Sequence, residues 1–355
     1  MWDIERFPPA DSVETKKVLK QCASAGRLIA ELKGVSQSIP NQAILINTLS
    51  LQEAKDSSAI ENIVTTHDDL FRGDLFPESV GNLAAKEVQN YIQALKTGFG
   101  VVKDSGLITL RTIQAIQEEL ERNRAGFRKL PGTELRNDTT GETVYMPPQH
   151  PETIQALMAR LESFINGSEF DGFDPLVRMA LMHHQFESIH PFYDGNGRTG
   201  RILNVLFLVK SGLLDIPVLY LSRYFIRDKA RYYRELQRVR TDGEWEPWIL
   251  YMLEAVESTA RLTLSQVAAI KDSFENYKQR IRNEYPKIYS QDLINNLFNH
   301  PYTKIEFIER DLGVSRLTAT KYLDSLSGPF LTKQKVGRYN YYINRALFDI
   351  LKNEQ

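Results

Sequence analysis

The residues in this sequence best suited to catalysis form one segment, 190–201, which reads His-Pro-Phe-Tyr-Asp-Gly-Asn-Gly-Arg-Thr-Gly-Arg. It contains an imidazole, a carboxylate, a Gly-rich turn and two arginines. The residues that follow, up to Lys210, are mostly apolar and lack proline, so we expect a buried helix that begins at the Gly-Asn-Gly turn. Backbone N–H groups at a helix N-terminus bind anions. The segment therefore predicts a site for a nucleotide triphosphate.

The two arginines of this segment, Arg198 and Arg201, lie three residues apart and face the same side of the first helical turn. Cations are unfavourable at the positive end of a helix dipole unless an anion lies between them. The planar guanidinium group presents paired donors that match phosphate oxygens. We therefore expect both arginines to bind the phosphates of the nucleotide.

The segment resembles the signature of the Fic family, H-P-F-x-[D/E]-G-N-G-R-x-x-R, with every fixed position present. The resemblance implies a mainly helical core that transfers AMP from ATP to a Ser, Thr or Tyr hydroxyl of a target protein and releases pyrophosphate. It makes His190 the general base, a role that suits an imidazole. It also makes Asp194 the ligand of a Mg²⁺ ion that bridges the α- and β-phosphates. The implied nucleotide-binding residues are Gly195, Asn196, Gly197, Arg198, Thr199, Gly200 and Arg201.

Two further histidines, His183 and His184, precede the segment together with Glu187. They are candidate metal ligands with His190, but the ordered spacing of a zinc motif such as H-E-x-x-H is absent. We expect them to be core or capping histidines.

A second motif, Ser57-Ser-Ala-Ile-Glu61-Asn62, resembles the Fic inhibitory helix pattern [S/T]-x-x-x-E-[G/N] and predicts such a helix over about 55–65. Ser57 and Glu61 are four residues apart and would share a helix face. The resemblance implies that Glu61 pairs with Arg201 and displaces the γ-phosphate of ATP. By itself the pattern is also typical of an exposed helix face. Whether Glu61 also supports the reverse reaction, removal of AMP, is left open.

Residues 130–148 have the β-branched and aromatic residues of a hairpin, with a turn over 138–141. In Fic proteins such a hairpin is a flap that aligns the target segment by strand addition. The flap residues expected to dock the target are Thr143, Val144, Tyr145 and Met146. The alternative is a plain surface hairpin.

Downstream, Tyr232 and Tyr233 resemble the aromatic pair that approaches the nucleobase in Fic proteins, and we assign Tyr233 to the nucleotide site. The tyrosines are equally typical of the core of an amphipathic helix. The asparagine that some relatives use as an adenine partner is not evident, because Arg240 and Thr241 stand there. The nucleotide base is thus open, and transfer of UMP or a phosphate is an alternative.

The predicted fold class is mainly α, with a hairpin flap on a helical Fic core and a small α+β winged helix at the C-terminal end. The expected divisions are a helical N-terminal region (1–85), the Fic core (86–255), a linking helix (256–285) and a winged helix (286–355). The winged helix is predicted from two helices, 305–312 and 316–326, and from two strands around a turn at 337–338.

The winged helix suggests a rival function, an ATP-sensing regulator that binds DNA through 304–338. Arg316 and Lys321 would enter a major groove, and Lys333, Lys335 and Arg338 would contact phosphates. Residues 286–355 hold ten Lys or Arg and seven Asp or Glu, a weakly basic balance. Contact with protein or dimer packing is an equal alternative.

Composition restricts the other classes of function. With 44 basic and 45 acidic side chains the formal charge is −1, so no overall attraction to nucleic acid or anionic membranes is expected. A single cysteine permits neither an internal disulfide nor a thiolate metal cluster. Without a long apolar run or a signal-peptide profile, we expect a cytoplasmic protein and no membrane partner. The expected partners are target proteins, with self-modification and a homodimer left open.

Overall fold

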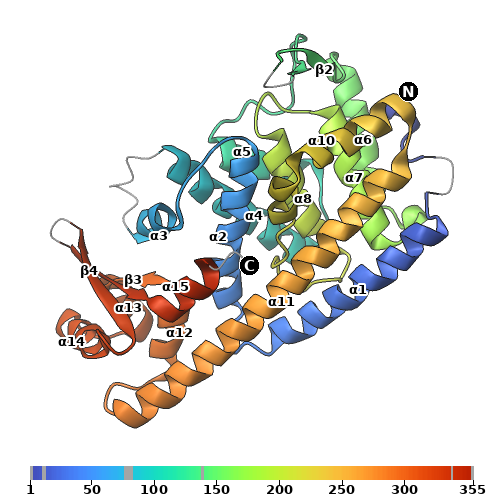
Figure 1. Cartoon of the computed structure of the whole chain (residues 1–355). Coiled ribbons are helices and arrows are strands. Elements are labelled where there is room, and N and C mark those ends of the chain that lie inside the picture. The colour runs from blue at the N-terminus through green and yellow to red at the C-terminus, as the bar shows by residue number, and fades with distance from the viewer. Residues whose placement is uncertain (1–2, 10–12, 76–82, 137–139, 337–338, 353–355) are drawn as a thin grey trace.

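The computed structural model describes residues 3–9, 13–75, 83–136, 140–336 and 339–352, and it is mainly helical (Figure 1). Its α-helices are α1 (Lys16–Gln37), α2 (Ala43–Ile60), α3 (His67–Leu75), α4 (Leu83–Ser105), α5 (Leu110–Glu121), α6 (Pro151–Asn166), α7 (Pro175–Ile189), α8 (Asn196–Lys210), α9 (Ser222–Arg227), α10 (Lys229–Asp242), α11 (Trp245–Glu284), α12 (Gln291–Asn299), α13 (Ile305–Leu312), α14 (Arg316–Leu326) and α15 (Arg345–Lys352). Two short 3₁₀ helices are η1 (Ile4–Arg6) and η3 (Ser168–Phe170).

The strands form two small antiparallel sheets. One is the hairpin of β1 (Leu135–Arg136) and β2 (Thr143–Tyr145). The other contains β3 (Tyr302–Thr303), β4 (Leu331–Val336) and β5 (Tyr339–Asn344), in the order β3-β5-β4. The predicted mainly helical fold is confirmed.

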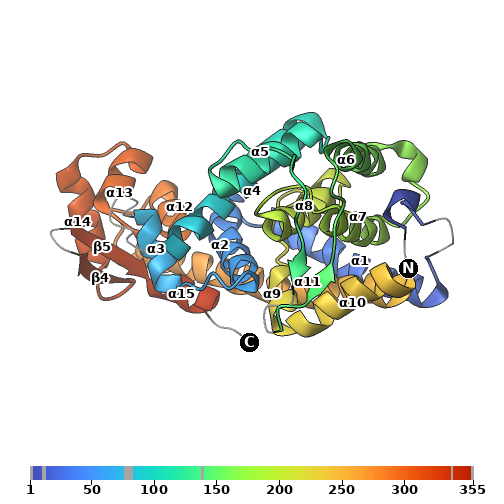
Figure 2. The same ribbon diagram turned by 90° about the horizontal axis from the view of Figure 1, so that it is seen from above.

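Helices α7 and α8 form the centre of the larger unit, with α4, α5 and α6 on one side and α10 and α11 on another (Figure 2). Every residue of α7 from Leu176 to Ile189 is buried, and α8 is buried as far as Leu208 except at Gly197. Helices that are buried on every side are enclosed by neighbouring elements. The segment 190–201 therefore begins and ends in rigid core helices, which fix the positions of its side chains.

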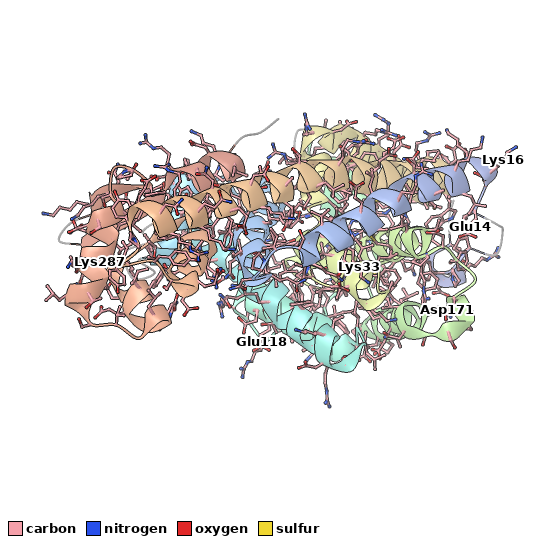
Figure 3. The ribbon with its side chains drawn as sticks, turned by 90° about the horizontal axis from the view of Figure 1, so that it is seen from below. Glu14, Lys16, Lys33, Glu118, Asp171 and Lys287 are labelled. Atoms are coloured by element: carbon pink, nitrogen blue, oxygen red, sulfur yellow. The ribbon has the colours of Figure 1, made fainter. Side chains whose placement is uncertain are left out.

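The long helix α11 runs across the whole molecule, and α1 packs along it (Figures 1 and 3). The buried face of α1 has the three- and four-residue spacing of an amphipathic helix, with Val18, Cys22, Ala25, Ile29, Leu32 and Ser36. Lys33 near its C-terminal end, labelled in Figure 3, donates to the carbonyl of Gly212 at 2.9 Å and pairs with Asp215 at 3.1 Å. These contacts tie α1 to the loop after α8.

The helix that was expected over 256–285 begins earlier, at Trp245, and forms the C-terminal part of α11. Pro247 does not prevent this, because it lies in the first turn, where a backbone N–H has no helical acceptor. No helix boundary occurs near residue 255. The larger unit and the C-terminal unit therefore share one continuous helix.

The C-terminal unit has the predicted winged-helix elements. Helices α13 and α14 have the expected bounds, and Ser315 caps α14 by accepting a hydrogen bond from the N–H of Thr318 at 3.3 Å. The two wing strands are present, while the expected turn at 337–338 lies outside the described residues. The unit packs against α2 and α3, where Phe71 contacts Tyr302 with ring centroids 5.3 Å apart.

No helix within the described ranges is both long enough and apolar enough to span a membrane.

Candidate active site

The loop between α7 and α8 holds His190 and the Gly-rich turn in a fixed shape. His190 ends α7 in the left-handed region, with φ 49° and ψ 58°, and its N–H donates to the carbonyl of Phe186 at 3.0 Å. Gly195, at φ 79°, turns the chain into α8. The side chain of Asn196 accepts from the N–H of Phe192 and donates to its carbonyl, both at 2.8 Å. The amide of Asn196 thus shapes the loop, and its backbone begins α8.

This loop forms one wall of a cavity of about 1170 Å³. Of the residues predicted from the sequence, ten line the cavity: Glu61, Val144, His190, Asp194, Gly195, Asn196, Gly197, Arg198, Arg201 and Tyr233. The wall also includes residues that the sequence did not suggest, among them Glu87, Lys229 and Arg240. Segments from α2, α4, the hairpin, α8 and α10 therefore meet at one site.

Six predicted residues lie outside the cavity wall: Ser57, Thr143, Tyr145, Met146, Thr199 and Gly200. Thr199 is fully buried. Gly200 lies where α8 passes close to α7, and a Cβ there would collide with the carboxylate of Glu187. Both residues therefore contribute to helix packing, and their predicted part in nucleotide binding stays a prediction.

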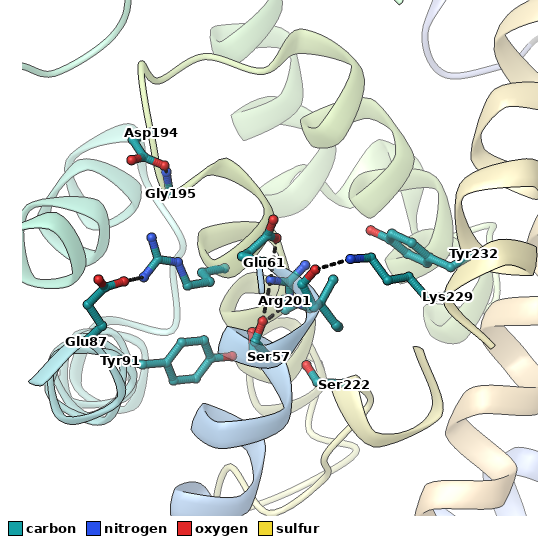
Figure 4. Close-up of polar contacts among 12 residues, drawn as sticks. Ser57, Glu61, Glu87, Tyr91, Asp194, Gly195, Arg201, Ser222, Lys229 and Tyr232 are labelled. Atoms are coloured by element: carbon teal, nitrogen blue, oxygen red, sulfur yellow. Dashed lines mark hydrogen bonds and ion pairs between the residues drawn. The ribbon is translucent and has the colours of Figure 1, made fainter. Parts of the chain in front are cut away.

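Arg201 is held by the end of α2 (Figure 4). Its Nε donates to Ser57 Oγ at 2.7 Å, and its Nη2 donates to Ser57 O at 3.0 Å and to Glu61 Oε1 at 2.8 Å. The Arg201 side chain is 1% exposed and that of Glu61 is 35% exposed. Burial opposes ionisation of Glu61, but the charge and hydrogen bond of Arg201 outweigh it and lower the pKa of the carboxyl. The pair is therefore ionised at neutral pH.

Glu61 lies at the end of a helix that differs from the expected one. The helix α2 spans Ala43–Ile60, and Glu61 follows it as the C-cap residue. It ends there because Asn62 adopts a left-handed backbone, at φ 63°, a conformation that asparagine tolerates. Lys229 Nζ donates to the carbonyl of Ile60 at 2.6 Å. The end of α2 is thus fixed from both the α8 and the α10 sides.

Arg198 is also paired with carboxylates. Its Nη1 lies 3.0 Å from Glu87 Oε2 on α4, and its Nη2 lies 2.8 Å from Glu121 Oε1 on α5. Both arginines of the segment therefore have acidic partners from other parts of the chain. From the sequence, such a partner is predicted for Arg201 alone.

The environment of His190 keeps its imidazole neutral. Burial, together with the nearby charges of Arg240 and Arg128, lowers its pKa from 6.5 to about 4. Arg128 is 1% exposed, and its Nε donates to the carbonyl of His190 at 2.7 Å while its Nη2 donates to Pro148 O at 2.9 Å. Arg128 thus joins the base of the hairpin to the loop that carries His190. A neutral imidazole held in this way is able to accept a proton.

The predicted hairpin is present but shorter than expected, because β1 and β2 cover only 135–136 and 143–145. Part of its turn, 137–139, lies outside the described residues. The Tyr145 hydroxyl donates to Ser188 O at 3.0 Å, and Arg240 lies 4.0 Å from the Tyr145 ring centroid. Gln237 of α10 donates to Val144 O at 3.1 Å. The side chain of Met146 is exposed. The hairpin is therefore anchored beside the cavity.

The two tyrosines of α10 have different environments. Tyr232 is 2% exposed, and its hydroxyl lies 2.9 Å from His183 Nε2. Tyr233 is 47% exposed and lines the cavity, with Lys229 Nζ 5.9 Å from its ring centroid. Both tyrosines line the cavity, and the more exposed Tyr233 offers the larger surface to a molecule bound there.

The histidines before the segment are core residues. His183 is fully buried between aromatic rings, including that of Trp248 at 5.9 Å, and burial lowers its pKa to about 3. His184 Nε2 lies 3.2 Å from the carbonyl of Leu236. The Nε2 atom of each histidine thus links α7 to α10.

The site residues that the sequence reasoning missed share one property. Each of them acts on the segment 190–201 or on the end of α2 from a distant part of the chain: Glu87, Glu121, Arg128, Lys229 and Arg240. None belongs to a motif with local spacing. Only the packing of α4, α5, α10 and the loop after α5 around the segment brings them to the site.

Comparison with known proteins identifies three successive segments. Residues 19–100 match the Fic/DOC family N-terminal model, residues 107–208 match the Fic/DOC family model, and residues 274–347 match the model of the C-terminal domain of SoFic-like protein adenylyltransferases.

Curated relatives named protein adenylyltransferase Fic include one from Aedes aegypti, 30% identical over 165 residues. That match covers 46% of this chain and 31% of the relative. A second, from Drosophila mojavensis, is 30% identical over 158 residues, which are 44% of this chain and 29% of the relative. The chain thus spans about a third of the length of the curated relatives it matches.

Two solved structures share the fold. A Fic family protein from Desulfovibrio desulfuricans G20 is 20% identical, covers 95% of this chain and 98% of its own, and has a TM-score of 0.59. A Fic domain containing signaling protein from Bacteroides thetaiotaomicron VPI-5482 is also 20% identical, with coverage of 69% and 98% and a TM-score of 0.58. With all three of its segments matched in order, this chain belongs to the Fic/DOC family.

Proposed function

We propose that this protein is an adenylyltransferase that transfers AMP from ATP to a hydroxyl group of a target protein, and that Glu61 restrains it. The observation that carries the proposal is the meeting of a neutral His190, the N-terminus of α8 and the Glu61–Arg201 pair in one cavity. The names of the curated relatives support the same activity.

In the proposed reaction the target hydroxyl attacks the α-phosphorus of ATP. Its proton passes to the unprotonated nitrogen of His190, the new O–P bond forms, and the bond to pyrophosphate breaks. The backbone N–H groups at the start of α8 stabilise the negative charge that develops on the phosphate oxygens. Gly197 lets the start of α8 approach the Glu61 carboxylate closely, because a Cβ at this position would collide with that carboxylate. Tyr233, which lines the cavity, is the proposed contact of the base.

Asp194 fits a role as the Mg²⁺ ligand. It is exposed in the cavity wall next to the start of α8, and a carboxylate beside phosphate oxygens is a donor set that Mg²⁺ prefers. When bound, the ion would neutralise part of the charge of the phosphates. The protein itself fixes the Asp194 carboxylate, because Oδ1 accepts a hydrogen bond from the N–H of Gly195 at 2.7 Å.

The restraint by Glu61 follows from the donors that it occupies. Arg201 is almost fully buried and gives three hydrogen bonds to Ser57 and Glu61. A γ-phosphate that binds Arg201 must replace the Glu61 carboxylate, so ATP binds in an unproductive position while the pair is intact. The flap residues 143–146 would align the target, and the protein itself is a candidate target.

The rival proposal of a DNA-binding regulator receives less support from the charges on the winged helix. Arg316 pairs with Glu306 at 2.9 Å and with Glu309 at 3.5 Å, and Lys333 pairs with Asp324 at 2.7 Å. Cations that are already paired with carboxylates neutralise fewer DNA phosphates, so fewer of the counterions on the DNA are released when the protein binds.

The proposal is tested by intact-mass spectrometry after incubation with ATP and Mg²⁺, together with a labelled-ATP assay on candidate targets. We expect AMP addition, about 329 Da per group, by the Glu61→Gly protein. We expect none by the Glu61→Gly/His190→Ala protein. Equal AMP transfer by the two proteins would refute the role of His190, and absence of transfer to itself and to every protein of a cell extract would refute the activity.

A further inference from the structure

Arg198 is held by two carboxylates that approach it from different helices. The Arg198 side chain is 5% exposed, and its two terminal nitrogens donate to Glu87 on α4 and to Glu121 on α5. Its Nε is buried and has no hydrogen-bond partner among the described residues. Figure 4 shows Glu87 reaching from α4 toward the start of α8. The two terminal nitrogens of Arg198 are therefore paired, while its Nε–H group has no acceptor among the described residues.

The two carboxylates differ in their surroundings. Glu121 is 13% exposed and lies behind the Gly-rich turn, where a Cβ on Gly195 would collide with it. It is not among the residues of the cavity wall. Glu87 is 38% exposed and lies in the cavity wall. An anion that enters the cavity can therefore contact Glu87. It can contact Glu121 only if the Gly-rich turn is displaced.

We propose that Glu121 is a positioning residue that holds Arg198 for phosphate binding, and that Glu87 competes with the nucleotide phosphates for the same arginine. Glu87 is then a second restraint, separate from the Glu61–Arg201 pair. The inference rests on the proposed function for the identity of the ligand, a nucleoside triphosphate.

The opposite effects expected on ATP binding when Glu87 or Glu121 is removed follow from their burial and charge. A partly exposed ion pair is weak because water screens it, so a polyphosphate with several negative charges can replace Glu87. Loss of the Glu87 carboxylate also removes a repulsion from the incoming phosphates. Glu121 is more deeply buried, and its loss leaves an arginine nitrogen inside the protein without a charged acceptor. The guanidinium then loses the orientation that phosphate binding requires.

The experiment measures the affinity of ATP with Mg²⁺, and separately of adenosine, by calorimetry on the full chain in the Glu61→Gly background. We expect Glu87→Ala to tighten ATP binding by about two- to fivefold. We expect Glu121→Ala to weaken it by about tenfold. Adenosine affinity should change in neither. Glu119→Ala is the matched control, because Glu119 lies on α5 and pairs with Arg122 outside the cavity, and it should leave ATP binding unchanged.

If an alanine variant does not fold, Glu87→Gln or Glu121→Gln is used in its place, because glutamine keeps the size of the side chain. ATP affinity that changes in the same direction at both positions would overturn the inference. So would an equal change in adenosine affinity, which would indicate general damage to the site, or the absence of ATP binding in every variant. If ATP binds but no AMP is transferred, the proposed function fails while these affinities still decide the roles of Glu87 and Glu121.

Discussion

Removal of the Glu61 carboxylate should activate AMP transfer by about tenfold. Arg201 donates to Glu61 at 2.8 Å, and a charge-assisted hydrogen bond contributes about 1.5–3 kcal/mol. Because the Glu61 side chain is 35% exposed, solvent screening places this pair near the lower limit, about 1.5 kcal/mol. That free energy corresponds to about tenfold in the population of the productive ATP position.

The hydrogen bond from Arg201 to Ser57 is a second, weaker contact with which the effect of removing Glu61 can be compared. Its hydroxyl accepts from Arg201 Nε at 2.7 Å, and a hydrogen bond of this kind contributes about 1 kcal/mol or somewhat more. Ser57→Ala should therefore activate less than the removal of Glu61, by roughly fivefold. Its backbone carbonyl still accepts from Arg201, so part of the contact remains.

The assay is the initial rate of AMP incorporation from labelled ATP, at an ATP concentration below saturation. Glu61→Gly and Glu61→Ala are measured together, because alanine removes the carboxylate without the backbone freedom of glycine. Both should activate equally, and the control Glu119→Ala, at a half-buried position on α5, should not. If the alanine variant stayed at the wild-type rate while it still bound ATP, the Glu61–Arg201 pair would not be the restraint.

Three other outcomes are expected. Burial and two arginines lower the pKa of His190 to about 4, and the Glu61 carboxylate opposes this shift. In the Glu61→Gly protein, which lacks that carboxylate, kcat/KM should therefore fall only at or below about pH 4, and not near 6.5. Lys229→Met removes the donor that lies 2.6 Å from Ile60 O. In the otherwise wild-type protein it should raise the rate of AMP transfer, but by less than Glu61→Gly does. An unchanged rate would show that Lys229 does not hold the end of α2. Tyr145→Phe removes the hydrogen bond to Ser188 O, worth about 1 kcal/mol, and should raise KM for the protein target about fivefold with the ATP affinity unchanged; the two constants measured side by side test this.

The secondary structure of the winged helix followed from the sequence because its signals are local. Helices α13 and α14 have the predicted bounds, since an N-cap serine, a left-handed glycine and the apolar spacing all act within a few residues. Longer-range packing decided the bounds elsewhere. The helix α11 continues through residue 255, where packing against α1 and α7 makes it one rigid element.

The sequence by itself determined the chemistry of the segment 190–201, because its base, its carboxylate and its glycine turn are adjacent in the chain. It also indicated Glu61, but through a motif and not through geometry. Only the tertiary structure showed Glu61 just beyond the end of α2 and bonded to Arg201. It also decided which carboxylates surround Arg198 and which charges depress the pKa of His190. Electrostatic effects act through space between elements far apart in sequence, so no local pattern encodes them.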